Sequence, residues 1–240
     1  MGTRDGYLRA LRFRTLTPLY DALIRWTMPE DAFKRRLVAQ AELGPGQRVL
    51  DLGCGTGTLT LLAKGTVPGA ELVGIDPDAD ALEIARAKSV RAGLEIRFDR
   101  GSATALPYPE GGFDRVLSSL VLHHLDPEGK RAAAREVYRV LRPGGALHVA
   151  DWGRPHNPLM RAAFLGVQLV DGFATTAESV AGRLPRILRE AGLERVEERG
   201  RFVTAFGTLA LYSARKPGGT RAARGIERPG SGGRPAGEHS

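Results

Sequence analysis

Cysteine and long apolar runs are scarce in this chain of 240 residues. Its one cysteine, Cys54, excludes an intramolecular disulfide and a metal cage built of cysteines. No stretch approaches the ~18 apolar residues that a membrane span needs. Residues 1–14 carry arginines without the continuous apolar core of a secretory signal. We therefore expect a cytoplasmic protein, long enough for one domain with a full core.

The excess of basic charge lies at the two ends of the chain. The net charge is +8, and residues 51–214 contribute nothing to it, because they hold twenty basic and twenty acidic side chains. A nucleic-acid enzyme is expected to carry its excess around the mouth of the active site. The distribution therefore favours a small-molecule partner over a nucleic acid, and it leaves the oligomeric state open.

The segment 49–58 (VLDLGCGTGT) predicts a ligand-binding turn between a strand and a helix. Three glycines in five residues let the backbone adopt conformations closed to other residues, and they let a ligand lie against bare peptide. A dinucleotide-binding fingerprint has glycine or alanine at the position that Thr58 occupies here. A P-loop requires a lysine at the end of the turn, and this turn has none.

Further landmarks follow the turn in a fixed order. Residues 72–76 (LVGID) predict a second strand that ends in Asp76, 19 positions beyond Gly57, where a carboxylate can accept hydrogen bonds from both ribose hydroxyls. The alternative is that Asp76 caps the next helix, although Asp78 can serve as that cap. Three more segments come downstream, at 101–109 (GSATALPYP), 113–119 (FDRVLSS) and 140–145 (VLRPGG).

Taken together, these landmarks resemble the class I S-adenosylmethionine (SAM) dependent methyltransferases over residues 45–152. The nearest resemblance is to the ubiquinone/menaquinone C-methyltransferase group. It implies SAM as the cofactor and a loop that lines its methionine part, with a carboxylate on the ribose and small residues at the adenine and under the sulfonium. The implied cofactor residues are Asp51, Gly53, Cys54, Gly55, Thr56, Gly57, Asp76, Pro77, Ser102, Ala103, Ser118 and Ser119.

Within that resemblance, individual roles differ. Asp51 would steady the loop and the SAM ammonium group. Ser102 departs from the acid or asparagine that many relatives carry there, which leaves mainly backbone contacts for the adenine. Ser118 and Ser119 would lie under the sulfonium, and simple packing at the strand end is the alternative for this pair.

The end of the fourth predicted strand separates this chain from other methyltransferases. Adenine-N6 enzymes place Asp/Asn-Pro-Pro-Tyr/Phe where residues 118–121 read SSLV, and cytosine-C5 enzymes need a cysteine after this strand. Catechol-type enzymes place an acidic metal ligand at the end of this strand, and residues 118–121 contain no acid. We therefore expect no metal. The resemblance thus implies metal-independent, in-line methyl transfer to a small apolar or aromatic acceptor, with orientation supplying much of the catalysis.

Four residues are candidates for catalysis or acceptor binding. His123 and His124 follow the fourth strand, and an imidazole there can remove a proton near neutral pH. Packing and a contact with the SAM carboxylate are the alternatives for this pair. Asp151 ends the fifth strand and can contact substrate or cap the next helix. Tyr20 lies in a segment that closes over SAM in relatives, although an aromatic on an apolar helix face is usually core.

The order of predicted elements indicates an α/β fold. Strands are predicted at 47–52, 70–75, 94–98, 113–118 and 145–151, helices at 57–64, 78–92 and 128–141, and a β pair at 193–199 and 202–214 joined through Gly200. The resemblance implies a Rossmann-like, doubly wound, mostly parallel seven-stranded sheet with an antiparallel last strand.

We expect four regions along the chain. Residues 1–45 form a helical cap, 46–216 the SAM-binding domain, and 217–240 a disordered basic tail. Within the domain, 152–192 form a helical insertion for the acceptor pocket, interrupted at Gly166, Gly172 and Pro185. Residues 4–16 interleave arginines with apolar residues, which indicates either a cap helix or peripheral contact with a membrane surface.

Two other functions stay open at this point. One is a SAM-binding protein without catalysis, which the intact glycine turn and Asp76 disfavour. The other is an NAD-dependent oxidoreductase, which Thr58 disfavours.

Overall fold

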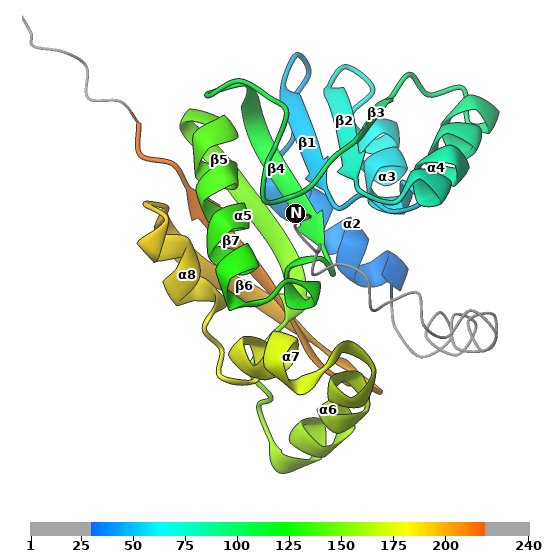
Figure 1. Cartoon of the computed structure of the whole chain (residues 1–240). Helices are drawn as coiled ribbons and strands as arrows, with labels where there is room; N and C mark the ends of the chain where they lie inside the picture. Colours follow the sequence, from blue (N-terminus) through cyan, green and yellow to red (C-terminus); the bar gives the residue numbers. More distant parts are fainter. Residues whose placement is uncertain (1–29, 219–240) are drawn as a thin grey trace, which may run out of the picture.

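The computed structural model describes residues 30–218, and its seven strands form one sheet in the order β3-β2-β1-β4-β5-β7-β6 (Figure 1). Neighbours from β3 to β5 pair in parallel, whereas β7 is antiparallel to both β5 and β6. This confirms the predicted mostly parallel, Rossmann-like sheet with an antiparallel last strand. The strands are β1 (Arg48–Leu52), β2 (Glu71–Asp76), β3 (Arg97–Arg100), β4 (Phe113–Ser119), β5 (Leu141–Trp152), β6 (Glu194–Thr204) and β7 (Gly207–Arg215).

Helices cover both faces of the sheet. Val116 and Leu117 are neighbours on β4, so their side chains point to opposite faces. Val116 belongs to a core with α5 (Pro127–Val140) and α8 (Leu184–Glu190), and Leu117 to a core with α2 (Glu30–Ala41) and α3 (Thr58–Thr66). The sheet is therefore doubly wound, with one apolar core on each side.

The remaining helices lie at the edges of the sheet. Helix α4 (Ala79–Arg91) packs Leu82 and Ala85 against Phe98 of β3. Helices α6 (Pro158–Asp171) and α7 (Phe173–Val180) lie beyond one end of the strands, at the bottom of Figure 1. A single 3₁₀ turn, η2 (Leu122–His124), follows β4.

The described part of the predicted N-terminal cap is α2. Its stripe Phe33, Leu37, Val38 and Ala41 is buried against the sheet, as the helical spacing predicts. Tyr20 and the segment 4–16 lie outside the described residues, as does the predicted tail from 219 onward. No helix within 30–218 is long and apolar enough to cross a membrane.

Two interruptions predicted from glycine are wrong. Gly166 lies inside α6, because Phe164 and Val167 on either side of it are buried in the core, and this offsets the ~1 kcal/mol that a helical glycine costs. Gly200 does not join two strands. It lies within β6 at a register shift between Glu198 and Gly200, and the hairpin turns instead at residues 205–206.

Two strand boundaries also differ from the prediction. Strand β3 spans Arg97–Arg100 rather than 94–98, because only four residues pair with β2. Strand β5 begins at Leu141 rather than at 145, since Leu141 already pairs with Phe113 before a bulge shifts the register. Gly172 does separate α6 from α7, and Pro185 stands in the first turn of α8.

Candidate active site

The carboxyl ends of five parallel strands bring the predicted site residues to one edge of the sheet. Leu52 of β1 pairs with Ile75 of β2 on one side and with Ser118 of β4 on the other, and Ser119 pairs with Ala150 of β5. The glycine turn, Asp76, the serine pair and Asp151 therefore end at similar heights. Ligands of open α/β sheets bind in the crevice at this edge.

The glycine turn follows β1 with a backbone that needs glycine. Gly53, Gly55 and Gly57 have φ of 70°, 51° and 77°. A Cβ on Gly57 would lie 2.9 Å from the Cβ of Ala85, so this glycine lets α3 and α4 approach. A Cβ on Gly55 would meet no atom within 4 Å. Gly55 therefore faces open space, where a ligand can lie against the peptide.

Asp76 connects the second strand to the glycine turn. One carboxylate oxygen accepts a hydrogen bond from the Gly55 amide at 2.9 Å, and the other accepts one from the Asp78 amide at 2.9 Å. Burial raises the pKa of Asp76, and these two amides oppose that rise. Asp78 itself caps α4 by accepting from the amides of Asp80 and Ala81. Asp76 is thus not the helix cap, and each of its oxygens retains a lone pair.

Asp51 lies buried beneath the turn. Its carboxylate accepts a 2.6 Å hydrogen bond from the hydroxyl of Thr60 on α3. Burial raises its pKa to about 6, although Thr60 and Lys34 act in the other direction. Burial likewise raises the pKa of the Cys54 thiol, so Cys54 is a neutral packing residue here. On the outer side of the turn, Lys88 of α4 donates to the hydroxyl of Thr56 at 2.8 Å.

The two serines at the end of β4 have different surroundings. Ser118 donates to the carbonyl of Leu52 at 3.3 Å, which ties β4 to β1. The hydroxyl of Ser119 is buried and has no hydrogen-bond partner among residues 30–218. A buried hydroxyl without a partner costs free energy, so Ser119 is the member of the pair that a ligand would satisfy.

The predicted adenine residues lie next to one another after β2 and β3. Ser102 is exposed, and its hydroxyl lies 2.9 Å from that of Thr104 within a short turn. Ala103 packs against the core, and the carbonyl of Pro77 accepts a hydrogen bond from Arg100. The Ser102 side chain is thus used locally, in keeping with a site that reads adenine through backbone groups.

His123 and Asp151 form a buried pair at the ends of β4 and β5. Nδ1 of His123 lies 2.7 Å from Oδ1 of Asp151, and the two side chains are 4% and 2% exposed. Asp151 also accepts hydrogen bonds from the amides of Leu122, His123 and Trp152. Burial alone would raise the pKa of Asp151, but His123 and these amides hold it below the usual value. The carboxylate therefore fixes the position of the imidazole.

Asp151 does not cap the next helix, α6, because the cap of α6 is Asn157. It binds His123 and accepts a hydrogen bond from the Leu122 amide at the start of the 3₁₀ turn. Its expected contact with substrate stays a prediction. His124 is the more exposed of the two histidines, and its ring centroid lies 3.9 Å from that of His123. Desolvation of its ring, followed by the charge of the neighbouring His123, lowers the pKa of His124.

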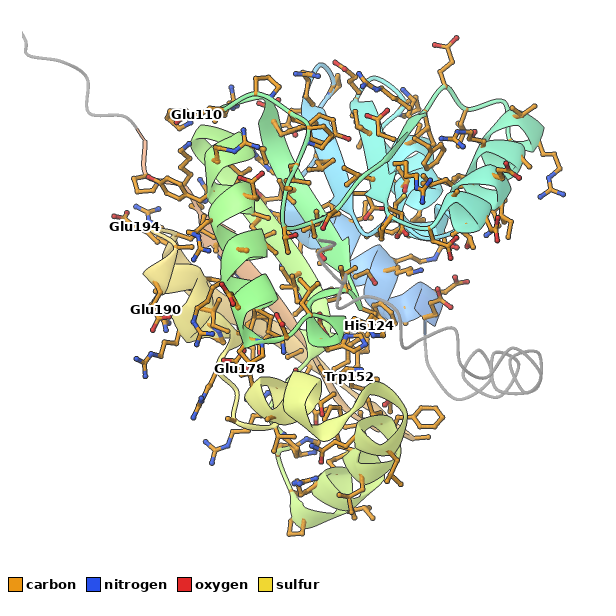
Figure 2. All side chains as sticks on the ribbon, in the orientation of Figure 1. Glu110, His124, Trp152, Glu178, Glu190 and Glu194 are labelled. Atoms are coloured by element: carbon orange, nitrogen blue, oxygen red, sulfur yellow. The ribbon has the colours of Figure 1, made fainter. Side chains whose placement is uncertain are left out.

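An ionic group of Lys130, Arg131 and Glu178 was not predicted from the sequence. Lys130 of α5 is 4% exposed, and its ammonium lies 3.9 Å from the carboxylate of Glu178 on α7, which also pairs with Arg131 at 3.2 Å. Desolvation lowers the pKa of Lys130. Figure 2 shows Glu178, His124 and Trp152 where α7 meets the sheet. A lysine on a predicted helix carries no signal for such a contact, because it depends on how two distant helices meet.

Aromatic residues adjoin the pair. The ring of Trp152 meets the edge of His123 at a centroid distance of 6.2 Å, and Phe164 of α6 meets Trp152 at 5.5 Å. Among the described residues, no three His, Cys, Asp or Glu side chains are grouped as a metal site would need.

Comparison with known proteins agrees with this geometry. Residues 49–145 match a family model described as a methyltransferase domain. A demethylmenaquinone methyltransferase of Thermus thermophilus is 41% identical over 145 residues, which cover 60% of this chain and 65% of that protein. The ubiquinone/menaquinone biosynthesis C-methyltransferase UbiE of Xanthomonas campestris is 34% identical over 207 residues, covering 77% of this chain and 79% of that protein.

Among solved structures, the apo form of the SAM-dependent methyltransferase SibL superposes with a TM-score of 0.66. It is 25% identical to this chain, and the match covers 90% of this chain and 63% of SibL. Fold and site together define a class I SAM-dependent methyltransferase. More narrowly, the chain belongs to the family of the ubiquinone/menaquinone C-methyltransferase UbiE.

The residues present fit the cofactor of that family. Gly55 borders open space where SAM would lie, Asp76 has a lone pair left on each oxygen for two ribose hydroxyls, and Ser119 has an unsatisfied hydroxyl. The cofactor is therefore SAM. The role of each residue toward SAM stays a prediction.

Proposed function

We propose that the protein transfers the methyl group of SAM to a ring carbon of an apolar hydroquinone, with His123 as the base and Asp151 as its positioning residue. The family supports the reaction at carbon, because the Xanthomonas relative is named a C-methyltransferase of ubiquinone/menaquinone biosynthesis. The Thermus relative, named a demethylmenaquinone methyltransferase, supports the quinone-type acceptor. The buried contact of 2.7 Å between His123 and Asp151 is the observation that carries the assignment of the base.

The chemistry assigns a defined task to His123. When bound, SAM supplies a methyl group on a positively charged sulfur. A hydroquinone carbon becomes nucleophilic when its ring hydroxyl loses a proton, and His123 removes that proton. The new carbon–carbon bond would form as the methyl–sulfur bond breaks, with S-adenosylhomocysteine as the leaving group. The ring carbon then releases its hydrogen as a proton to water, and the ring oxygen takes back the proton held by His123, which restores the neutral imidazole. No covalent enzyme intermediate is needed.

Asp151 prepares the imidazole for this task. A carboxylate that accepts from Nδ1–H selects one tautomer and leaves Nε2 as the nitrogen that takes up a proton. The imidazolium formed is then stabilised by the charge of the carboxylate 2.7 Å away. Because both side chains are buried, this interaction is weakened little by water.

An apolar acceptor fits the surroundings of the pair. The ring of Trp152 adjoins His123, and Phe164 packs against Trp152 in turn. A ring stacked near Trp152 would exclude water from the methyl-transfer path. The predicted contribution of Tyr20 to this pocket stays a prediction, since it lies outside the described residues.

The experiment that tests the function supplies SAM with a deuterated methyl group to the purified protein. Acceptors are a reduced naphthohydroquinone with an unsubstituted ring carbon, the same compound already methylated at that carbon, and a catechol. We expect a trideuteromethyl product with the first acceptor alone, located on the ring carbon by NMR. Product on oxygen, or equal turnover of the blocked naphthohydroquinone, would refute methylation at carbon.

A further inference from the structure

A hollow of about 430 Å³ lies on the face of the sheet that α2 covers. Its walls come from the end of α2, from β4 and β5, and from the β6–β7 hairpin. Arg115 on β4 stands four residues before Ser119, which is about 13 Å along a strand. The hollow is therefore separate from the SAM edge. Its charged and polar lining consists of Arg36, Gln40, Glu42, Arg115, His148, Ser213, Arg199 and Arg215.

The lining is strongly cationic. It holds four arginines and one acid, Glu42. Arg36 and Arg215 form no ion pair with any residue in 30–218, and Arg199 pairs with Glu197 at 2.9 Å. Arg115 is held by carbonyls of Ala41 and Asp114 rather than by a carboxylate. The arginines of the hollow therefore carry more positive charge than the neighbouring acidic side chains neutralise.

These cations are close enough to perturb one another. Desolvation and the charge of Arg215 lower the pKa of Arg115. Burial, followed by the charges of Arg115 and Arg215, lowers the pKa of His148 to about 3. Nδ1 of neutral His148 lies 3.2 Å from the side-chain amide nitrogen of Gln40. The side-chain carbonyl oxygen of Gln40 is buried and has no partner in the part of the chain that the structure describes. Repulsion between like charges in such a cluster is relieved when an anion binds among them.

The two ends of the chain carry no excess of negative charge. Residues 1–29 hold five basic against two acidic side chains, and residues 219–240 hold four against two. The composition of both ends therefore favours an anion from outside the chain as the neutralising group.

We propose that this hollow is a binding site for a small anion that carries two or more phosphate groups. Guanidinium groups present paired N–H donors that match phosphate oxygens, and the four arginines exceed what one singly charged carboxylate would neutralise. A volume of about 430 Å³ suits a small molecule. The same chemistry can come from a soluble diphosphate or from a lipid headgroup, and the test separates the two.

The first measurement is calorimetry of the full chain with sodium pyrophosphate at about 0.15 M salt, where weak surface attraction is screened. The pocket variant is Arg36→Glu with Arg215→Glu. The matched control is Arg35→Glu with Arg91→Glu, since both arginines are exposed and neither lines the hollow. Each pair changes the net charge equally. We expect one site in the wild type, a loss of at least about tenfold in affinity in the pocket variant, and less than about twofold in the control.

Thermal unfolding and SAM affinity serve as checks that the variants fold. The milder pair Arg36→Gln with Arg215→Gln is used if charge reversal prevents folding, and pyrophosphate is also expected to raise the melting temperature of the wild type. A second arm measures co-sedimentation with cardiolipin vesicles, whose headgroup carries two phosphate groups, against phosphatidylcholine vesicles. Pyrophosphate binding assigns a soluble ligand, and vesicle binding that needs Arg36 and Arg215 without pyrophosphate binding assigns a lipid phosphate. Equal behaviour of pocket and control variants in both arms, or no binding in either, overturns the proposal.

Discussion

Replacing Asp76 with alanine tests the cofactor site most quantitatively. Each carboxylate oxygen already accepts one backbone amide, from Gly55 or from Asp78. One lone pair per oxygen is left, so the carboxylate can hold both ribose hydroxyls of SAM at once. Hydrogen bonds to a charged group contribute about 1.5–3 kcal/mol each. Two bonds at the lower value give about 3 kcal/mol, so we expect Asp76→Ala to weaken SAM binding roughly 100-fold.

Calorimetry with SAM and with S-adenosylhomocysteine measures this effect, because both ligands share the ribose. Asp76→Asn keeps one acceptor oxygen and should fall between wild type and alanine. Asp78→Ala is the matched control. It removes the cap on the amides of Asp80 and Ala81, which should cost about 1 kcal/mol of stability without changing SAM affinity. A dissociation constant for Asp76→Ala within threefold of the wild type would show that the ribose binds elsewhere.

Further variants test other parts of the account. Gly55→Val should abolish SAM binding and cost about 1–2 kcal/mol of stability, because valine would have to adopt φ 51°. Gly57→Ala should lower the melting temperature further, because its Cβ would also lie 2.9 Å from that of Ala85. Folded Asp51, with its pKa raised from 3.8 to about 6, keeps a proton that the unfolded chain releases, so stability should fall by about 3 kcal/mol as pH rises through that window. Asp51→Asn should lack this fall in chemical denaturation, and an equal slope in both proteins would contradict the assignment. Asp151→Asn should lower both kcat and stability, since one amide oxygen cannot replace a carboxylate that binds His123 and three backbone amides. Deleting 219–240 should leave SAM affinity and kcat unchanged, and a tenfold loss of either would give this segment a role.

The sheet and its order of elements were predictable because their signals are local. Apolar runs, the glycine turn and Asp76 lie in one continuous stretch, and a family resemblance supplied the number of strands and the antiparallel last strand. Glycine was a poorer guide at Gly166 and Gly200. There, packing of Phe164 and pairing with β7 outweighed the local preference for a break.

The pairing of His123 with Asp151 was not predicted, although both residues were candidates. They stand 28 positions apart, and only the adjacency of β4 and β5 brings their side chains together. The rule that carboxyl ends of neighbouring parallel strands meet at one edge would have been the available signal. Lys130 with Glu178 and the arginines of the hollow beside α2 had no such rule, because helix packing and a hairpin bring them together.

The most direct test of the proposed mechanism is the single-turnover rate of methyl transfer to the naphthohydroquinone in His123→Gln and His124→Gln, with SAM bound at saturation. We predict a loss of about 10²–10⁴-fold in His123→Gln, with SAM affinity unchanged, because the general base is removed. His124→Gln leaves the hydrogen bond between His123 and Asp151 in place, so it should lose less than about tenfold. A His123→Gln protein that transfers the methyl group at the wild-type rate would contradict the assignment of His123 as the base.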